Sequence, residues 1–227
     1  MDKRLSYSRN SIVDSYDRRR FNGRSGEFVN WIELDTTYSF LKKYSLYNKV
    51  ILDAPCGTGR FSQFLKAVGI EIIGMDYSEA MVKQTLNKIK IPVARGDMFS
   101  LPIKTSSVGC IVSLRFMFHY RSIRDVLYEL NRVLCNGGMV IFDTFNWSPK
   151  ANFIFRDNRV FIHTRTKLVG LLKEIGLNII DERHCFLVSP QVYKILPLRL
   201  TKLMRNFEKL LPSCLLARSF WCAEKVG

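Results

Sequence analysis

The chain has 227 residues, a length typical of one α/β domain with an appendage. Hydrophobic residues make up 47% of it, which excludes a disordered chain, and no apolar run is long enough to span a bilayer. The net charge is +15, which leaves open both an anionic partner, such as nucleic acid or an acidic carrier protein, and an ordinary solvated face.

The six cysteines are scattered along the chain without a CxxC pair, and the charged N-terminus leads into no apolar core. We therefore expect no zinc site, no disulfide framework and no signal peptide. These features together favour reduced thiols and a cytoplasmic location.

Hydrophobic periodicity predicts two helical stretches within residues 8–46, separated by a basic, glycine-bearing loop at 17–26. From residue 49 strands and helices alternate, and the helix at 121–134 is expected to stop at Asn136-Gly137-Gly138. Strands are predicted at 49–53, 70–76, 91–97, 108–116 and 139–145, with helices at 60–69, 78–89 and 121–134. A further helix and strand (164–188), a basic amphipathic helix (194–211) and a last strand (215–226) complete the chain.

This alternation predicts an α/β fold with a doubly wound, mostly parallel sheet and helices on both faces. The hairpin-like end of the chain should add an antiparallel C-terminal edge strand. We expect a single globular unit overall.

Three successive strand ends carry the residues of a nucleoside pocket. Asp53 ends the first strand and runs into a Gly57-Thr58-Gly59 turn, where glycines allow a ligand to approach the backbone. Asp76 ends the second strand, 19 residues after Gly57, at a distance suited to both hydroxyls of a ribose. Asp97 ends the third strand and can accept a hydrogen bond from an exocyclic amine such as that of adenine.

A dinucleotide does not fit this pattern. The stretch from Gly57 to Ser62 lacks the third glycine that seats a pyrophosphate, and no Gly-Lys-Ser/Thr follows for a Walker loop. The pocket therefore suits an adenosine without a phosphate chain.

From about residue 48 to 146, the chain resembles the class I S-adenosylmethionine-dependent methyltransferases. The resemblance is carried by "VILDAPCGTGRF", "IIGMDYSEAM", "VARGDMFSLPI", "VGCIVSLRFMFHY" and "ELNRVLCNGGMVIFDTFN". It implies a Rossmann-like fold and S-adenosyl-L-methionine as cofactor, with no metal. Two residues depart from the family pattern: Pro55 replaces a usual glycine, and Gly109 replaces an acid common early in the fourth strand. Since Pro55 requires only φ near −65° and no N–H donor, we do not expect it to abolish binding.

The resemblance also implies a cofactor site, residue by residue. The amino-acid part of the cofactor would contact Asp53, Ala54, Cys56, Gly57 and Gly59, and its ribose would bind Asp76. The adenine would contact Tyr77, Met81, Asp97 and Met98, and the sulfonium would lie near Ser113 and Leu114.

An N-terminal helix often closes over the cofactor in this family, so we expect residues 1–47 to form a helical lid and residues 48–227 the methyltransferase domain. Tyr16, Arg20 and Phe21 could line that lid, with an arginine on the cofactor's carboxylate. The alternative is a solvated basic helix end.

On the acceptor side, His119 is the candidate general base, since its unperturbed pKa of about 6.5 suits proton transfer. A histidine that merely holds a loop is the alternative. Asp143 and Asn146 could orient an acceptor or could form a turn and a cap, while His163 and His184 look structural.

The helix at 194–211 has an apolar face and a basic face. We expect the apolar face to pack on the domain's own sheet or over the acceptor pocket, and peripheral membrane docking is the alternative. Its apolar residues are Leu196, Leu200, Leu203, Phe207, Leu210 and Leu211, and its cations are Arg199, Lys202, Arg205 and Lys209.

Three functions stay open. The first is methyl transfer to an O or N atom of a small or medium metabolite. The second is RNA methylation, motivated by the +15 charge, although no appended RNA-binding motif is found. The third is a non-catalytic, cofactor-binding regulatory subunit.

Overall fold

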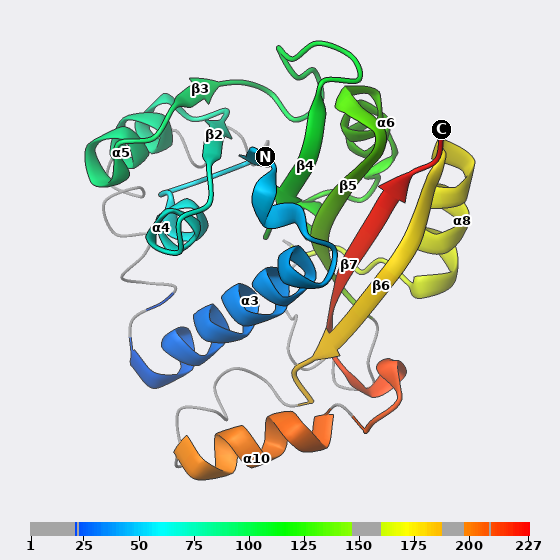
Figure 1. Cartoon of the computed structure of the whole chain (residues 1–227). Coiled ribbons are helices and arrows are strands. Elements are labelled where there is room, and N and C mark those ends of the chain that lie inside the picture. Colours follow the sequence, from blue (N-terminus) through cyan, green and yellow to red (C-terminus); the bar gives the residue numbers. More distant parts are fainter. Residues whose placement is uncertain (1–20, 22, 147–159, 188–197, 209) are drawn as a thin grey trace.

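A seven-stranded sheet forms the centre of the computed structural model, which describes residues 21, 23–146, 160–187, 198–208 and 210–227 (Figure 1). Its strands are β1 (Ile51–Asp53), β2 (Ile72–Asp76), β3 (Val93–Arg95), β4 (Val108–Ser113), β5 (Leu134–Phe145), β6 (Leu177–Cys185) and β7 (Arg218–Lys225). They lie in the order β3-β2-β1-β4-β5-β7-β6. Strands β1 to β5 are parallel, whereas β7 runs antiparallel to both neighbours, β5 and β6. The expected α/β fold with antiparallel strands at one edge is confirmed.

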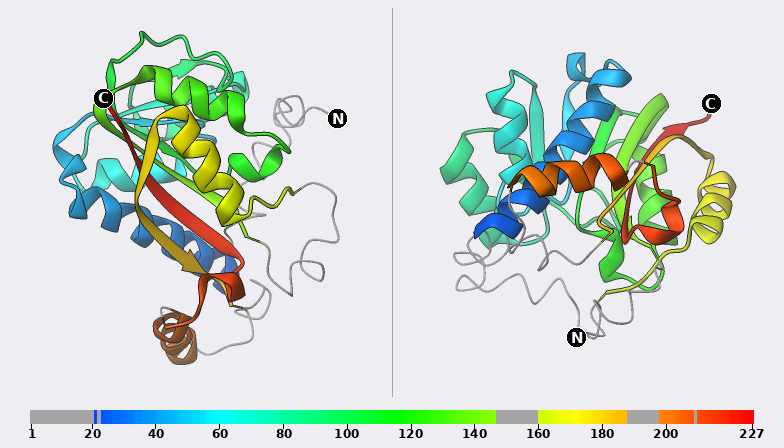
Figure 2. Two further views of the ribbon diagram at one scale, coloured as in Figure 1. Left: turned by 90° about the vertical axis from the view of Figure 1, so that its right-hand side faces the viewer. Right: turned by 90° about the horizontal axis from the view of Figure 1, so that it is seen from below.

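Helices cover both faces of this sheet (Figures 1 and 2). One buried cluster joins the sheet to α3 (Gly23–Lys43), α4 (Arg60–Ala67) and α5 (Glu79–Ile89). A second cluster joins the opposite face to α6 (Arg124–Val133) and α8 (Arg165–Ile175). The last helix, α10 (Leu198–Glu208), lies at one end of the sheet and contacts α3 (Figure 2). Short 3-10 helices occur at η1 (Leu46–Asn48), η2 (Met117–His119) and η3 (Ser213–Leu215).

Neighbouring residues of the central strands belong to different faces. Ile51 and Val112 are in the cluster with α3 and α4, whereas Leu52 and Ile111 are in the cluster with α6. Successive side chains of a strand point to opposite sides, so a strand covered on both faces needs apolar residues at every position. This explains the continuous apolar runs in the sequence.

The sheet reverses its strand order between β1 and β4, with β2 and β3 on one side and β5 on the other. Ligands of open α/β sheets bind outside the carboxyl ends of the strands at this switch point. The residues after Asp53, at the end of β1, therefore lie where a ligand is expected.

Two predicted boundaries are wrong. Gly23 to Gly26, which we assigned to a loop, form the first turn of α3. Helix α6 ends at Val133, and Asn136-Gly137-Gly138 lie inside β5 rather than stopping a helix. Gly137 has a φ of +69°, next to a register shift against β4, and a Cβ on Gly138 would lie 2.7 Å from the Cys135 carbonyl oxygen. These glycines allow the irregular backbone of β5 at this register shift.

We predicted that the C-terminal strand forms the edge of the sheet, and this prediction is wrong. β7 lies between β5 and β6, so β6 forms the antiparallel edge. Phe220, Trp221 and Cys222 of β7 are all fully buried, as expected for a strand inside the sheet that is covered on both faces.

Helix α3 shares a core with the rest of the described chain. Its Ile32, Phe40 and Leu41 are fully buried in the same cluster as Ile51 of β1. A domain boundary at residues 47 and 48 remains a prediction. Among the described residues, no helix is both long enough and apolar enough to cross a membrane.

Candidate active site

The turn after β1 is fixed by hydrogen bonds to neighbouring elements. The Gly57 N–H donates to Asp76 Oδ2 at 2.9 Å, and the Thr85 hydroxyl donates to the Gly57 carbonyl oxygen at 2.9 Å. Gly59, the N-cap of α4, has a φ of +74°, and a Cβ there would lie 2.8 Å from Thr85 Cγ2. A glycine is therefore required at 59 for both conformation and space. Pro55, which follows a cis peptide bond, lies in the wall of the pocket beside this turn.

Asp76 is buried at the end of β2, and its carboxylate is oriented by two backbone groups. Besides Gly57, the Ser78 N–H donates to Asp76 Oδ1 at 2.8 Å. Burial raises the pKa of Asp76, and these two N–H groups oppose that shift by stabilising the charge. Each carboxylate oxygen can accept a further hydrogen bond. Since Asp76 lines the pocket, it can accept both hydroxyls of a ribose.

Asp53 is buried at the end of β1 and accepts a hydrogen bond from the Ser62 hydroxyl at 2.5 Å. Burial raises the pKa of Asp53 from 3.8 to about 7, against the opposing effects of Ser62 and the Arg60 charge. A cationic group bound next to Asp53 would favour its ionised form.

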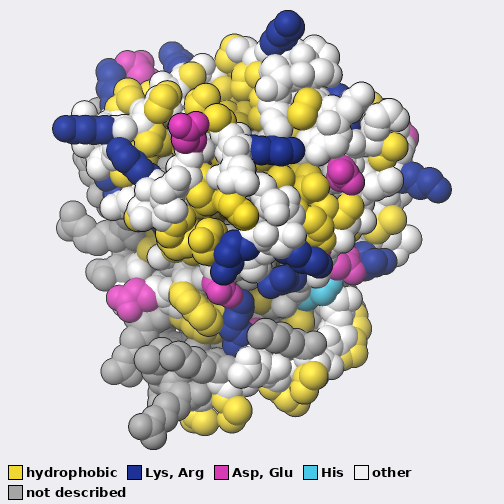
Figure 3. Space-filling view, in the orientation of Figure 1, with side chains coloured by type: hydrophobic (Ala, Val, Ile, Leu, Met, Phe, Trp, Pro, Cys, Tyr) yellow, Lys and Arg dark blue, Asp and Glu magenta, His cyan; other side chains and the backbone are white. Residues whose placement is uncertain are grey.

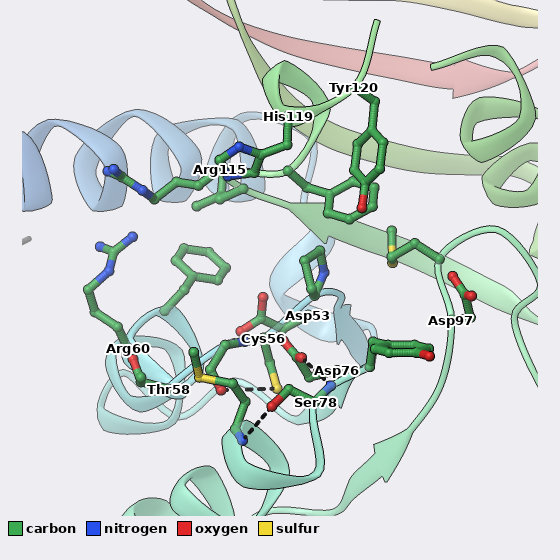
Figure 4. Close-up of a pocket in the computed structure, with 18 of the residues that line it drawn as sticks. Asp53, Cys56, Thr58, Arg60, Asp76, Ser78, Asp97, Arg115, His119 and Tyr120 are labelled. Atoms are coloured by element: carbon green, nitrogen blue, oxygen red, sulfur yellow. Dashed lines mark hydrogen bonds between the residues drawn. The ribbon is translucent and has the colours of Figure 1, made fainter. Parts of the chain in front are cut away.

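Asp97 supplies the third carboxylate of the pocket wall. Its Oδ1 accepts a hydrogen bond from the Phe99 N–H at 3.0 Å, which fixes the side chain in the turn after β3. Figure 4 shows Asp97 on one side of the pocket and Arg60 on the other, with Asp53 and Asp76 between them.

The opposite wall comes from the segment after β4. Arg115, His119 and Tyr120 line it, and the Tyr120 hydroxyl points toward the acids (Figure 4). Tyr120 packs against two further rings, with centroid distances of 5.1 Å to Phe99 and 4.9 Å to Phe116. The pocket is therefore acidic on one side and aromatic on the other.

Behind the pocket, a buried glutamate of α3 binds three arginines. Glu33 is fully buried and forms ion pairs with Arg60, Arg115 and Arg218. Burial alone would raise the pKa of Glu33, but the guanidinium groups of Arg218, Arg115 and Arg60 hold it far below its usual range. We call Glu33, its three arginines and Asp143 the Glu33 network.

Asp143 completes this network at the end of β5. It accepts a hydrogen bond from Arg218 Nε at 2.8 Å and from the Arg115 N–H at 2.5 Å. Asp143 therefore positions Arg115 from behind, and the suggestion that it orients an acceptor is wrong. Asn146 is likewise internal, because its side-chain amide donates to Ser219 Oγ and to the Leu216 carbonyl oxygen.

The Glu33 network also reaches the N-terminal segment. The Phe21 ring lines the pocket and lies between two cations, with Arg60 Cζ 4.2 Å and Arg115 Cζ 5.2 Å from its centroid. Phe21 is thus the described residue of the predicted lid that contributes to the pocket. Tyr16 and Arg20 lie outside the described residues.

Most of the predicted site residues meet in one pocket. Asp53, Cys56, Gly57, Asp76, Tyr77, Met81, Asp97, Met98, Leu114 and His119 all line it. Ala54, Gly59 and Ser113 are buried and are not among the residues that line it. Their contacts with a cofactor, like those of the lining residues, stay predictions.

Sequence reasoning did not single out seven residues that line the pocket: Thr58, Arg60, Phe61, Ser78, Arg115, Phe116 and Tyr120. It also missed Glu33. An acid on the apolar stripe of a predicted helix was the available signal, but its partners come from elements far away in the chain. His163 and His184 lie outside the pocket wall and contact Met117 O and Ser219 Oγ, in agreement with structural roles.

The pocket's chemistry fits S-adenosylmethionine. Asp53, Asp76 and Asp97 place three carboxyl groups around the cavity, which suits a ligand with a positive charge, two hydroxyls and an amine. When ionised, these acids would disfavour a phosphate chain next to them, and the two arginines of the pocket wall, Arg60 and Arg115, are paired with Glu33. Within the described residues, no group of three or more His, Cys, Asp or Glu is arranged to hold a metal ion.

The fold and the pocket define a nucleoside-binding, Rossmann-like domain. Residues 52–142 match the family model described as "Methyltransferase domain". Residues 52–142 are thus identified as a methyltransferase domain, of the class I type that uses S-adenosylmethionine.

Known proteins support this assignment at moderate similarity. An uncharacterized chloroplastic methyltransferase of Arabidopsis thaliana is 30% identical over 151 residues, which are 56% of this chain and 42% of that protein. A probable S-adenosylmethionine-dependent methyltransferase of Mycolicibacterium smegmatis is 29% identical over 60% of this chain and 54% of its own length. The chain thus spans about half the length of these relatives.

A solved structure shares the fold over nearly the whole chain. Magnesium protoporphyrin IX methyltransferase from Synechocystis, determined with bound S-adenosylhomocysteine, superimposes with a TM-score of 0.71 at 16% identity. The match covers 99% of this chain and 100% of the other. At this identity the similarity establishes the fold.

Proposed function

We propose that this chain transfers a methyl group from S-adenosylmethionine to an oxygen or nitrogen atom of a small or medium metabolite, by in-line displacement. The observation that carries the proposal is the pocket itself: three carboxylates on successive strand ends face a wall that holds His119 and Tyr120. The donor would lie along the acids, and the acceptor would enter beside the aromatic wall.

When bound, S-adenosylmethionine supplies an electrophilic methyl group on a cationic sulfur. The protein's contribution is to hold both reactants in line and to exclude water, which can supply about 7–11 kcal/mol at best. Asp76 would fix the ribose and Asp97 the adenine amine, while ionised Asp53 would lie next to the positively charged part of the ligand.

His119 would act on the acceptor. An oxygen or nitrogen nucleophile loses a proton during methylation, and the imidazole of His119 lines the pocket on the acceptor side. Its ring packs against Phe118 at a centroid distance of 4.7 Å, which restrains its orientation. The neighbouring rings of Phe116 and Tyr120 favour an acceptor with an apolar or aromatic part.

Product analysis tests this proposal. The protein is incubated with isotope-labelled S-adenosylmethionine and a cell extract divided into small-molecule, RNA and protein fractions, and labelled products are identified by mass spectrometry. We expect label in the small-molecule fraction, and none with Asp76→Ala. Label in RNA alone would make the chain an RNA methyltransferase. Saturable cofactor binding without any labelled product would favour the regulatory subunit. A cytoplasmic location remains a prediction that cell fractionation can test.

A further inference from the structure

Helix α10 turns its apolar side chains outward. Leu200, Leu203 and Phe207 of the helix, and Leu210 just beyond it, are exposed by 46%, 65%, 54% and 81%. Their spacing of three, four and three residues places them on one side of a helix. We call these four residues the apolar ridge. The expectation that this face packs on the domain's own sheet or over the acceptor pocket is therefore wrong for these four residues, while Leu196 lies outside the described residues.

The inward side of α10 is held by polar contacts. Glu208 is buried, and its carboxylate accepts a hydrogen bond from the Leu187 N–H at 2.7 Å. Arg205 pairs with Asp35 of α3 at 2.5 Å and lies 4.9 Å from the Trp31 ring centroid. Turning the apolar ridge inward would break these contacts and would expose Glu208 in place of the leucines. The helix is thus anchored with its apolar ridge facing away from the domain.

The region around the apolar ridge is basic. Residues 198–211 contain Arg199, Lys202, Arg205 and Lys209, and Glu208 is the one acid in this stretch. Arg205 is paired with Asp35 and Glu208 is buried, so the excess of basic residues in this stretch of sequence comes from Arg199, Lys202 and Lys209. The whole chain adds a net charge of +15.

We propose that the apolar ridge docks on an anionic lipid surface. Exposed apolar side chains with basic neighbours on one amphipathic helix are the features that bind the boundary between headgroups and acyl chains. A stable protein interface takes about 20–30 residues on each side, whereas this patch is one face of an 11-residue helix. Figure 3 shows hydrophobic side chains at the lower end of the molecule, where Figure 1 places α10.

Docking there would bring the pocket's end of the sheet toward the lipid. α10 leads through η3 into β7, whose first residue, Arg218, pairs with Phe145, the last residue of β5. The helix therefore lies at the carboxyl end of the parallel strands (Figure 2). The pocket is lined by residues that follow β1 and β4, so it lies at the same end.

Vesicle flotation tests the proposal independently of any methylation. The full chain is mixed with vesicles of phosphatidylcholine alone or with 30 mol% phosphatidylglycerol, at low and at high salt. We expect binding to the anionic vesicles at low salt and much weaker binding to neutral ones. Leu203→Gln/Phe207→Gln should reduce the bound fraction at least tenfold, while Leu86→Gln, which changes a leucine 41% exposed on α5, should leave it unchanged.

Thermal unfolding of each variant confirms that it is folded. The proposal is overturned if the wild type does not float with anionic vesicles at low salt, or if the double variant floats as well as Leu86→Gln. A wild-type dimer in light scattering that the double variant abolishes, without vesicle binding, would assign the apolar ridge to a second copy of the chain.

Discussion

The Glu33 network gives the sharpest prediction for stability. Glu33 is fully buried, and three guanidinium groups converge on its carboxylate. Glu33→Gln keeps the shape of the side chain and removes its charge. Arg218, whose side chain is 3% exposed, would then keep Asp143 as its charged partner, with two other arginines nearby.

The size of the effect follows from burial. Removing one partner of a buried ion pair costs about 3–5 kcal/mol, because the remaining charge is left uncompensated. Glutamine can still accept one hydrogen bond, so we expect the lower end, about 3 kcal/mol. For a domain of this size, 1 kcal/mol corresponds to about 2–4 °C in Tm. Glu33→Gln should therefore lower Tm by about 6–12 °C.

Urea unfolding at pH 7, supported by calorimetric scans, measures this loss. The matched control is Asp35→Asn, two residues away on the same helix, because Asp35 also pairs with an arginine but its side chain is 47% exposed. Exposed pairs contribute about 0–1 kcal/mol, so the control should remain close to the wild type.

Equal effects of the two substitutions would refute this argument. A loss below about 1 kcal/mol for Glu33→Gln would mean that the three arginines do not depend on the glutamate. A loss matched by Asp35→Asn would mean that helix α3 itself, rather than the buried charge, is responsible.

Three further predictions concern the pocket. Asp76→Ala should raise the Kd for S-adenosylhomocysteine at least about 100-fold, because it removes two hydrogen bonds to a charged group that contribute about 1.5–3 kcal/mol each. An unchanged Kd in calorimetry would contradict the assignment of Asp76 to the ribose. Asp53 should make the free protein less stable as pH rises from about 4 to 7, because its pKa lies near 7 when folded and near 3.8 when unfolded. Asp53→Asn should remove this slope of at most about 1.4 kcal/mol per pH unit, and an identical profile for the variant would show that Asp53 does not titrate there. His119→Ala should lower kcat about 10²–10⁴-fold and remove the loss of activity at acidic pH, whereas an unchanged pH profile would leave His119 as a structural residue.

The pocket could be predicted from the sequence because its parts are local. Asp53, Asp76 and Asp97 each stand at the end of a predicted strand, and parallel strands bring such ends together at one edge of the sheet. The glycine turn is equally local, since Gly57 and Gly59 both adopt positive φ angles, which glycine allows without strain.

The Glu33 network could not be predicted because its partners are remote. Glu33 and Arg218 are 185 residues apart and meet only once β7 has been inserted next to β5. Periodicity places an acid on the buried side of a helix, but it does not say which arginine lies opposite.

The errors have a similar origin in tertiary packing. Asn136-Gly137-Gly138 looks like the end of a helix, and the same residues permit an irregular strand once β4 lies alongside. For α10, helical spacing defined the apolar face correctly, yet the burial of Glu208 decided which face turned outward.

The most direct test of the central claim is calorimetric titration of the purified chain with S-adenosylhomocysteine, with NAD and ATP as controls. The pocket predicts one saturable site per chain, no comparable binding of the two phosphate-bearing nucleotides, and loss of the site in Asp76→Ala. A folded chain that binds no S-adenosylhomocysteine at millimolar concentration, or that binds NAD or ATP more tightly, would contradict the assignment.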